Sequence, residues 1–526
     1  MTTPHAGHPR RWSILAVLIL ALFGIAMDNT VLVTALPVLS RDLNAGTSQL
    51  QWMIDAYVLV FAGLLLLSGA LSDRFGRRRL LVIGLGLFGL GSALTPLVGS
   101  AGQLIALRSF MGLGAALAMP PTLSIIADVF PENERPKAIA LWSMVSALGI
   151  VVGPILGGFL IERFPWPTVF VINVPVIVVG IVAALRIIPE SKAPGRNPLD
   201  PIGAAFSVVA LVGLTYGIIE APGFGWSDPR IAGSLIAAVI AAAGFVLWER
   251  SRAHPMVEIG LFRNLRFTAA CVSVTLSMFA LNGNLFLVTL YLQQVRGLSP
   301  LETGYRFMAI AAGVVVASPV AARMTTRYGA RLTTSLGLAI IATGMGLVAT
   351  LGVSSGDLQV LGIMFVAAVG MGMAMTPATD AIMGAVPPEK FGVGSAVNDV
   401  TREIGGALGI AIMGSAFQGA YAGRIGVAVA GMPADAAGAA RDSFAGAAAV
   451  AAQLGGDAGA ALLGSARTAF VGAMDWTAIV GVAFAIAGVV VAAAFLPARS
   501  AAAGGAAPNG EPASLEPEEP EAETAA

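Results

Sequence analysis

Apolar residues along this chain come in blocks of about twenty, separated by short polar segments. A bilayer core of about 30 Å is crossed by about twenty helical residues, so the blocks predict membrane-spanning helices rather than the striped helices of a soluble domain. We expect fourteen spans. They are Trp12–Leu36, Leu50–Leu71, Leu80–Val98, Leu104–Val129, Ala138–Leu160, Pro167–Ile188, Ile202–Ala221, Ile231–Trp248, Phe267–Gln293, Leu301–Ala322, Leu332–Leu351, Leu358–Met383, Gly392–Phe417 and Trp476–Leu496.

The distribution of Lys and Arg predicts how these spans are oriented. The first block contains Asp28 and is too long for a signal peptide, so we expect it to be retained as span 1. With a cytoplasmic N-terminus, the inner loops and tails hold 20 of the 30 basic residues, the outer loops hold 7, and 3 lie within spans. This bias predicts that both termini of a multi-pass inner (plasma) membrane protein are cytoplasmic.

Composition agrees with the block pattern and excludes several classes of protein. The chain is 56% hydrophobic and 11% charged with zero formal net charge, and its mean hydropathy is +0.83. The balanced charge argues against a nucleic-acid partner. Cys271 is the single cysteine, and His5, His8 and His254 all lie outside the apolar blocks. We therefore expect no metal site and no cofactor within the membrane.

An internal repeat organises the spans into two halves. Arg74-Phe75-Gly76-Arg77 matches Arg327-Tyr328-Gly329-Ala330 at an offset of 253 residues, and Pro121 matches Pro377 at 256. Gly149 and Gly153 match Gly405 and Gly409, again at 256. The offset spans eight helices, which is two more than a six-helix half. The sequence therefore predicts a duplicated six-helix bundle with an inserted hairpin between the copies.

The expected boundaries follow from this repeat. They are a cytoplasmic N-terminal tail (1–11), an N-terminal six-helix bundle (12–190), an inserted two-helix hairpin (199–250), a C-terminal six-helix bundle (262–497) with an outer loop (418–475), and an acidic cytoplasmic tail (498–526). The composition of the tail is typical of disorder. The outer loop is rich in Ala and Gly, and it is either a weakly amphipathic helical pair or a disordered loop.

The loop between spans 2 and 3 combines small residues with acidic and basic ones. Small residues there allow close approach of helix ends, and the acidic and basic groups can form ion pairs across the cytoplasmic face that hold one conformation shut. A loop that only sets topology would need the arginines alone. The candidate gate-loop residues are Gly69, Asp73, Arg74, Gly76, Arg77 and Arg78.

Span 5 carries a run of glycines around a proline. Four glycines make a close-packing face, and the proline bends the helix and frees a backbone carbonyl. A kinked packing helix without a transport role is the alternative. The residues concerned are Gly149, Gly153, Pro154, Gly157 and Gly158.

Charged residues within the spans are the candidates for proton coupling. A charge at mid-membrane costs several kcal/mol, so it usually faces a partner or a polar cavity. Asp28, Asp55 and Arg108 all fall in the outer half of their spans, where an acid beside an arginine could alternate between ion-paired and protonated states. A static pair that only orients helices is the alternative. In span 13, Asp399 and Arg402 are three residues apart and could pair with each other.

These motifs together resemble the major facilitator superfamily. Gly69-x-x-x-Asp73-Arg74-x-Gly76-Arg77-Arg78 resembles its loop between spans 2 and 3, and the span 5 run resembles the antiporter motif of its drug:proton antiporters. Met27-Asp28-Asn29-Thr30 and Phe170-to-Pro175 are similar to signatures of the fourteen-span branch of multidrug efflux transporters. In that branch Arg108 takes a proposed proton-relay position, and Arg402 fits the pattern, whereas Asp399 stands where a neutral residue is often expected.

The resemblance implies an all-α integral membrane protein with the major facilitator fold. It implies a proton-coupled exporter of amphipathic or cationic organic compounds, including antibiotics, that works by alternating access, uses the proton motive force and is a monomer. A narrow-substrate exporter of a metabolite, lipid or self-made antibiotic is the alternative. A membrane enzyme or a receptor is disfavoured, because the sequence shows no catalytic constellation or phosphate loop.

Overall fold

The computed structural model describes residues 8–131, 134–192, 200–252, 255, 257–385 and 391–496. Every regular element in these ranges is helical. The elements are α1 (Arg11–Asp42), α2 (Thr47–Phe75), α3 (Arg77–Leu94), η1 (Thr95–Leu97), α4 (Ala101–Val129), α5 (Arg135–Arg163), α6 (Thr168–Val171), α7 (Asn173–Ile187), α8 (Pro201–Phe224), α9 (Pro229–Ser251), η2 (Ile259–Arg263), α10 (Leu265–Leu290), η3 (Tyr291–Val295), α11 (Pro300–Arg306), α12 (Met308–Val348), α13 (Asp357–Gly384), α14 (Phe391–Ile425), α15 (Ala434–Asp442), α16 (Phe444–Leu454) and α17 (Gly456–Phe495).

Twelve stretches of the described residues are long and apolar enough to cross a bilayer. This is two fewer than the fourteen spans expected from the sequence. The helix α5 is not among the twelve, and Pro300–Val348 counts as one stretch although Gly329 interrupts it with a φ of 87°. The expected number of spans is therefore not confirmed by this count.

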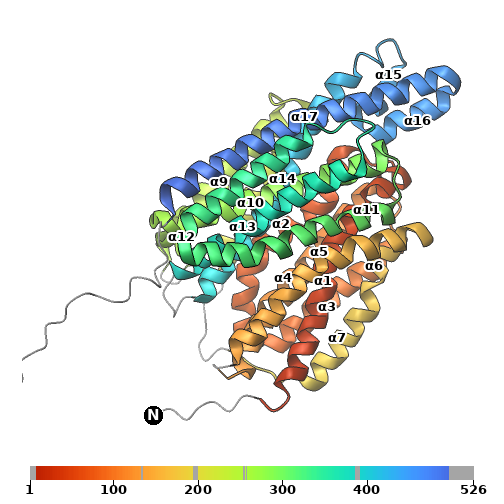
Figure 1. Ribbon diagram of the computed structural model, residues 1–526. Coiled ribbons are helices and arrows are strands. Elements are labelled where there is room, and N and C mark those ends of the chain that lie inside the picture. The colour runs from red at the N-terminus through yellow and green to blue at the C-terminus, as the bar shows by residue number, and fades with distance from the viewer. Residues whose placement is uncertain are drawn as a thin grey trace, which may run out of the picture.

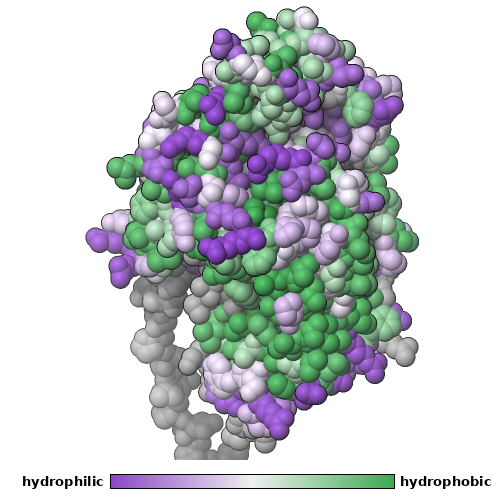
Figure 2. Space-filling view, turned by 90° about the vertical axis from the view of Figure 1, so that its right-hand side faces the viewer, coloured by the Kyte–Doolittle hydropathy of each residue, from purple (hydrophilic) through white to green (hydrophobic). Residues whose placement is uncertain are grey.

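The outer surface of the helices is apolar over a broad belt. Figure 2 shows hydrophobic residues covering the lower middle of the molecule, with hydrophilic residues gathered at its lower edge and in its upper part. Large side chains such as Val239, Ile240 and Leu247 of α9 are exposed on the protein surface. A soluble monomer would bury a belt of this kind, so these side chains face lipid.

The helices form two bundles. One consists of α1 to α7 and the other of α10 to α17, and in Figure 1 they occupy the red-to-yellow and green-to-blue parts of the molecule. We call them the N-terminal bundle and the C-terminal bundle. The hairpin of α8 and α9 lies at the seam between them, where α8 contacts both α2 and α14. The two bundles also contact each other directly, through α2 with α14 and through α5 with α11, so the hairpin packs along one side of the seam.

The two ends of the molecule differ. At one end, which we call the capped face, α15 and α16 extend beyond the helical bundles (Figure 1). At the other end, which we call the terminal face, the chain enters α1 and leaves α17. The loop that joins α2 to α3 lies at the terminal face, as does the beginning of α10.

Two expectations about helix limits are corrected by the structure, and of the two alternatives for the outer loop the helical pair is confirmed. The segment 418–475 is not a disordered loop: α14 continues to Ile425, α15 and α16 form a helical pair, and α17 already begins at Gly456, twenty residues before the expected Trp476. Span 6 is broken into α6 and α7 at Ile172. The tail 498–526 and residues 1–7 lie outside the described residues.

Candidate functional site

A fully buried ion pair lies inside the N-terminal bundle. The Arg108 guanidinium of α4 donates from Nη1 to Oδ2 of Asp28 on α1, and both side chains are 0% exposed. Arg108 Nε also donates to the Met53 carbonyl at 3.0 Å, and Asn173 Nδ2 donates to Asp28 Oδ1 at 3.0 Å. Both carboxylate oxygens of Asp28 therefore have a partner, as a buried charge requires.

Aromatic rings complete the surroundings of the Arg108 guanidinium. Its carbon lies 4.3 Å from the centre of the Tyr57 ring and 5.9 Å from that of Phe170. Such contacts stabilise a desolvated cation by roughly 2 kcal/mol. Because Arg108 stays charged in a protein, Asp28 is the member of this pair that can take up and release a proton.

Sequence reasoning placed Asp28 and Arg108 in one region but missed Asn173. Asn173 is the first residue of α7, directly after the break at Ile172, and it is fully buried. The available signal was a single amide side chain in the apolar run from Phe170 to Pro175. A polar side chain in such a run needs a partner, and here the partner is Asp28.

Asp55 is close in sequence to this site but does not join it. Its side chain is buried on α2, and neither carboxylate oxygen has a hydrogen-bond partner among the described residues. One turn earlier, Gln51 Nε2 donates to the carbonyls of Ile410 and Ala411 on α14, at 3.0 and 3.1 Å. The face of α2 that carries Asp55 therefore lies along the seam between the bundles, apart from Arg108 and Asp28.

Asp399 and Arg402 lie on α14 of the C-terminal bundle, away from the Asp28 site. The expected ion pair between them is not formed in the described part of the chain, although both side chains are partly buried. The neighbouring Asn398 accepts a hydrogen bond from the Thr379 hydroxyl of α13 at 3.3 Å. The sequence spacing placed the two charges on one helix face but did not decide whether their side chains meet.

The loop between α2 and α3 fastens the terminal face of the N-terminal bundle. Gly76 has a φ of 118°, which only glycine adopts without strain, and it turns the chain from α2 into α3. Arg77 donates from Nε and Nη2 to Asp73 Oδ1, at 3.1 and 3.0 Å, and from Nη1 to Asp128 on α4. Gly69 lies opposite Pro120 of α4, at the same helix contact.

The remaining arginines of this loop differ from one another. Arg78 donates from its backbone nitrogen to Glu190 at 3.2 Å and from Nη1 to the Ile188 carbonyl at 3.1 Å. Arg74 is exposed, with its guanidinium 5.6 Å from the centre of the Phe75 ring. All described ion pairs of this loop stay inside the N-terminal bundle, and none reaches the C-terminal bundle. In the described residues, the ion pairs of this loop therefore fasten the terminal face of the N-terminal bundle alone.

The glycine run of α5 lies against two different helices. A methyl group at Gly153 would collide with Thr30 of α1, and one at Gly157 would lie 3.1 Å from Val31. A methyl group at Gly158 would collide with Leu301 of α11, in the other bundle. The side-chain surroundings of Gly149 are outside the described part.

Pro154 extends this contact between the bundles. Its carbonyl lies directly against Gly304 of α11, where a side chain would collide with it. The helix α5 therefore touches α1 beside Asp28 and touches the C-terminal bundle one turn further on. This arrangement gives a direct mechanical path from the ion pair to the contact between the bundles.

The hydrogen bonds that join the two bundles lie near the capped face. Besides those of Gln51, Gln293 Nε2 of η3 donates to the Thr34 carbonyl of α1 at 2.9 Å. The Leu301 backbone nitrogen donates to Glu162 at the end of α5 at 3.1 Å. Among the described residues, no hydrogen bond or ion pair joins the bundles near the terminal face. The capped face is therefore the closed side of the seam.

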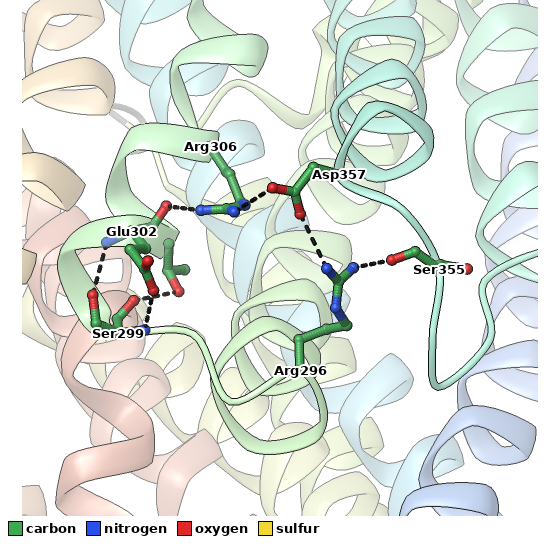
Figure 3. Close-up of polar contacts among 7 residues, drawn as sticks. Arg296, Ser299, Glu302, Arg306, Ser355 and Asp357 are labelled. Atoms are coloured by element: carbon green, nitrogen blue, oxygen red, sulfur yellow. Dashed lines mark hydrogen bonds and ion pairs between the residues drawn. The ribbon is translucent and has the colours of Figure 1, made fainter.

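The helix α11 is held in place for this contact by polar groups of its own bundle. Ser299 and Glu302 form a reciprocal capping box at its start. Figure 3 shows Arg306 at its end and Arg296 after η3 converging on Asp357, the first residue of α13. These contacts fix the part of the C-terminal bundle on which α5 rests.

A cavity of about 1100 Å³ lies between the capped ends of the bundles and the pair α15 and α16. Arg41 of α1 and Asn44 of the turn after it line the cavity on one side, and Asp435 and Asp442 of α15 line it on the other. The Thr47 hydroxyl at the start of α2 donates to the Asp442 carbonyl at 3.1 Å and so ties α15 to the N-terminal bundle. The cavity is large enough for a drug-sized molecule.

Comparisons with known proteins agree with this architecture. Residues 18–410 match the model of the Major Facilitator Superfamily. The multidrug efflux pump LfrA of Mycolicibacterium smegmatis is 35% identical over 92% of this chain and 95% of its own length. The tetracenomycin C resistance and export protein of Streptomyces glaucescens is 34% identical over 78% of this chain and 77% of its own.

Two further similarities concern a resistance protein and a solved fold. The methyl viologen resistance protein SmvA of Salmonella typhimurium is 33% identical over 88% of this chain and 93% of its own length. The crystal structure of a bacterial homologue of the human lysosomal transporter Spinster has a TM-score of 0.66 at 18% identity, covering 94% of this chain and 99% of that one. The chain is therefore a multi-pass membrane protein that belongs to the Major Facilitator Superfamily, a family of transporters.

Proposed function

We propose that the protein is a proton-coupled exporter of amphipathic or cationic organic compounds. The observation that carries the proposal is the fully buried Asp28–Arg108 pair, placed where α1 meets the glycine run of α5. The similarity to efflux and resistance proteins supports the class of substrate. The work of export is supplied by the proton motive force, without a resident cofactor.

The geometry suggests how a proton is linked to movement. When Asp28 is ionised, Arg108 and Asn173 hold its carboxylate, and α1 and α4 are tied together. A proton on Asp28 removes the charge that Arg108 neutralises and weakens this tie. Movement of α1 displaces α5 through the Gly153–Thr30 contact, and α5 in turn leaves α11. The capped face then opens as the terminal face closes, which is alternating access.

We assign the other candidate residues to supporting roles. Asp55 at the seam, and Asp399 with Arg402 on α14, are further titratable or charged groups along the transport path. The gate loop with Asp73 and Arg77 closes the terminal face in the opposite conformation, when Arg74 meets the C-terminal bundle. In this proposal the present conformation is the one open toward the terminal face, because the described hydrogen bonds between the bundles lie near the capped face.

We further propose that the chain crosses the membrane fourteen times. Adding α5 to the twelve stretches, and dividing Pro300–Val348 at Gly329, gives that number. The two bundles then correspond to 12–190 and 262–497, the hairpin to 199–250, and the terminal face with both termini lies in the cytoplasm. A monomer in the plasma membrane is sufficient for the mechanism, because the cavity and the seam lie within one chain.

A narrow-substrate exporter is the second candidate. The specific observation that favours it is the 34% identity to a relative named for the export of tetracenomycin C. Both candidates share the proton site and differ only in the compounds that are moved.

Proton flux in everted membrane vesicles tests the proposal. Vesicles are energised, lipophilic cations and neutral amphiphiles are added, and internal pH is followed with a dye. We expect compound-dependent proton release with the wild type and with Asp42→Asn, an exposed acid on the same helix, and none with Asp28→Asn. If no compound moves protons with the wild type, the narrow-substrate candidate takes precedence. Equal release by Asp28→Asn would show that the coupling site lies elsewhere.

A further inference from the structure

An apolar groove lies on the side of the molecule where the hairpin meets the bundles. It has a volume of about 600 Å³ and is walled by α2, α8, α9, η2, α10 and α14. Phe245, Val246, Phe262, Val272, Val400 and Ile404 are among its lining residues. The few polar lining groups are hydroxyls and the Cys271 thiol, so the groove offers almost no hydrogen bonds to a ligand.

The groove belongs to the half of the membrane next to the terminal face. Its lining includes Val257 and Ile259, which lie in the segment between α9 and α10, and Thr268 near the start of α10. Val246 and Phe262 are 36% and 37% exposed. The groove is therefore reached from the lipid of that leaflet.

Arginines surround the end of the groove at the terminal face. Arg250 follows Val246 by one turn of α9 and so continues the groove-facing side of that helix. Arg263 directly follows Phe262, and Arg252 and Arg266 lie on either side of the same connecting segment. All four side chains are exposed, and none forms an ion pair with a residue in the described ranges.

The nearby acidic side chains do not cancel this positive rim. Asp200 is 3% exposed and accepts hydrogen bonds from Trp248 and from the Gly203 nitrogen. Glu249 is 2% exposed and accepts from the Val257 nitrogen. Glu258 also has a partner within the protein. Asp200 and Glu249 are thus turned inward, while the four arginines are exposed at the membrane surface.

We propose that this groove binds an anionic phospholipid, with an acyl chain in the groove and the phosphate at the arginines around Arg250 and Arg263. An apolar slot with basic groups at headgroup depth is the chemistry that recognises such a lipid. A cationic substrate would be repelled by the same arginines. Because α8 contacts both α2 and α14, a lipid bound here fastens the hairpin across the seam of the two bundles.

Lipid retention on the purified full-length protein tests this site. The protein is exchanged into nanodiscs with equal amounts of phosphatidylglycerol and phosphatidylcholine, extracted, and the retained lipid is counted by native mass spectrometry. We expect the wild type to prefer phosphatidylglycerol and Arg250→Gln/Arg263→Gln to lose about thirtyfold in that preference. Each arginine near an anionic lipid contributes about 1 kcal/mol, and about 1.4 kcal/mol corresponds to a tenfold change.

Two further variants separate the groove from general surface charge. Arg323→Gln/Arg331→Gln removes two exposed arginines from α12 near the same face and should leave the preference unchanged. Val400→Phe fills the groove and should reduce retention with the arginines intact. Equal retention of both lipids by the wild type, or an equal loss in the α12 variant, would overturn the proposal. Displacement of the lipid by tetraphenylphosphonium would overturn it too, because the groove would then be a substrate site. None of these results depends on transport activity.

Discussion

The two bundles share one internal frame. In the N-terminal bundle, Gly84 of α3 and Gly114 of α4 each lie against the other's carbonyl. In the C-terminal bundle, Gly337 of α12 and Gly370 of α13 do the same. Gly153 of α5, which lies against α1, corresponds likewise to Gly409 of α14, which lies against Phe279 of α10. The repeat seen in the sequence is therefore a repeat of helix contacts in which no side chain fits.

The interiors built on this frame differ. When the two bundles are aligned on these matched glycine contacts, Asp28 corresponds to Ala280 and Arg108 corresponds to Met364 of the C-terminal bundle. Both of those residues line a small apolar cavity between α10, α12 and α13. One bundle thus carries a buried ion pair at two positions where the other carries an alanine and a methionine. The comparison teaches that the frame can be built without charges at these positions, as the proposed role of the pair in proton coupling requires.

The largest effect is expected when Arg108 alone is replaced by methionine, the residue at the corresponding position of the C-terminal bundle. Arg108→Met leaves the Asp28 carboxylate buried without its ion-pair partner, which costs about 3–5 kcal/mol. The double variant Asp28→Ala/Arg108→Met copies the C-terminal bundle and should recover most of that stability, but it should not transport. Thermal unfolding in detergent and vesicle flux measure the two quantities.

This double variant decides whether the comparison holds. If it stays as unstable as Arg108→Met, the pair is part of the frame and the bundles are not equivalent. If it transports with normal proton coupling, the pair has no role in coupling.

A smaller effect is expected from methyl groups at the matched glycines. Gly153→Ala and Gly409→Ala each overfill a helix contact, at a cost of about 1–3 kcal/mol. Gly153→Ala should reduce transport more, because it alone lies beside Asp28 on the path to α11. Unfolding and flux of both variants are compared with Gly86→Ala and Gly362→Ala, where the added methyl group meets open space. An equal loss of transport in both variants would mean that the two helix contacts contribute equally to the conformational change.

The seam between the bundles gives the next effect. Gln51→Leu removes both hydrogen bonds to the α14 carbonyls and should weaken closure of the capped face by about 0.5–1.5 kcal/mol. Faster hydrogen exchange of α14 around Ile410 would report it. Gln359→Leu is the control, because in the described part of the chain Gln359 bonds to Thr350 of its own bundle and to no other residue. Unchanged exchange in Gln51→Leu would show that these bonds do not hold the face closed.

The smallest effect concerns the pH dependence of the cap. Partial burial, and then the negative charge of Glu220, raise the pKa of Asp442 above its ordinary value. The docked cap therefore binds this proton more tightly than an undocked one. Its docking is strongest at acid pH and weakens as pH rises from about 4 through the raised pKa. Hydrogen exchange of α15 and α16 between pH 4 and 7 measures this trend, and Asp442→Asn should remove it while Asp435→Asn retains it.

The sequence was sufficient for the parts of the fold that depend on local composition. Apolar blocks located the helices, and the repeat predicted two bundles. The predicted beginning of the last helix at Trp476 was wrong, because Asp457, Arg467 and Asp475 lower the hydropathy of the residues before it. Alanine-rich residues continue the helix regardless, since helix propensity does not depend on the membrane.

The candidate site, too, could be predicted from the sequence only in part. Intramembrane charge alone indicated Asp28 and Arg108, because such residues need partners. It could not show that Asn173 supplies the second partner, or that Asp55 lies at the seam with no hydrogen-bond partner among the residues that the structure describes. Those facts depend on how α2, α4 and α7 rotate against one another, which the spacing within one helix does not determine.

The buried pair also has a consequence for biogenesis. Asp28 and Arg108 are separated by 80 residues of chain. At a synthesis rate of about 5–20 residues per second, Asp28 leaves the ribosome roughly 4–16 s before its partner. During that interval the first helix must stay in the membrane with an unpaired acid, at an insertion cost of about 3 kcal/mol. The strongly apolar composition of α1 offsets that cost until α4 is inserted.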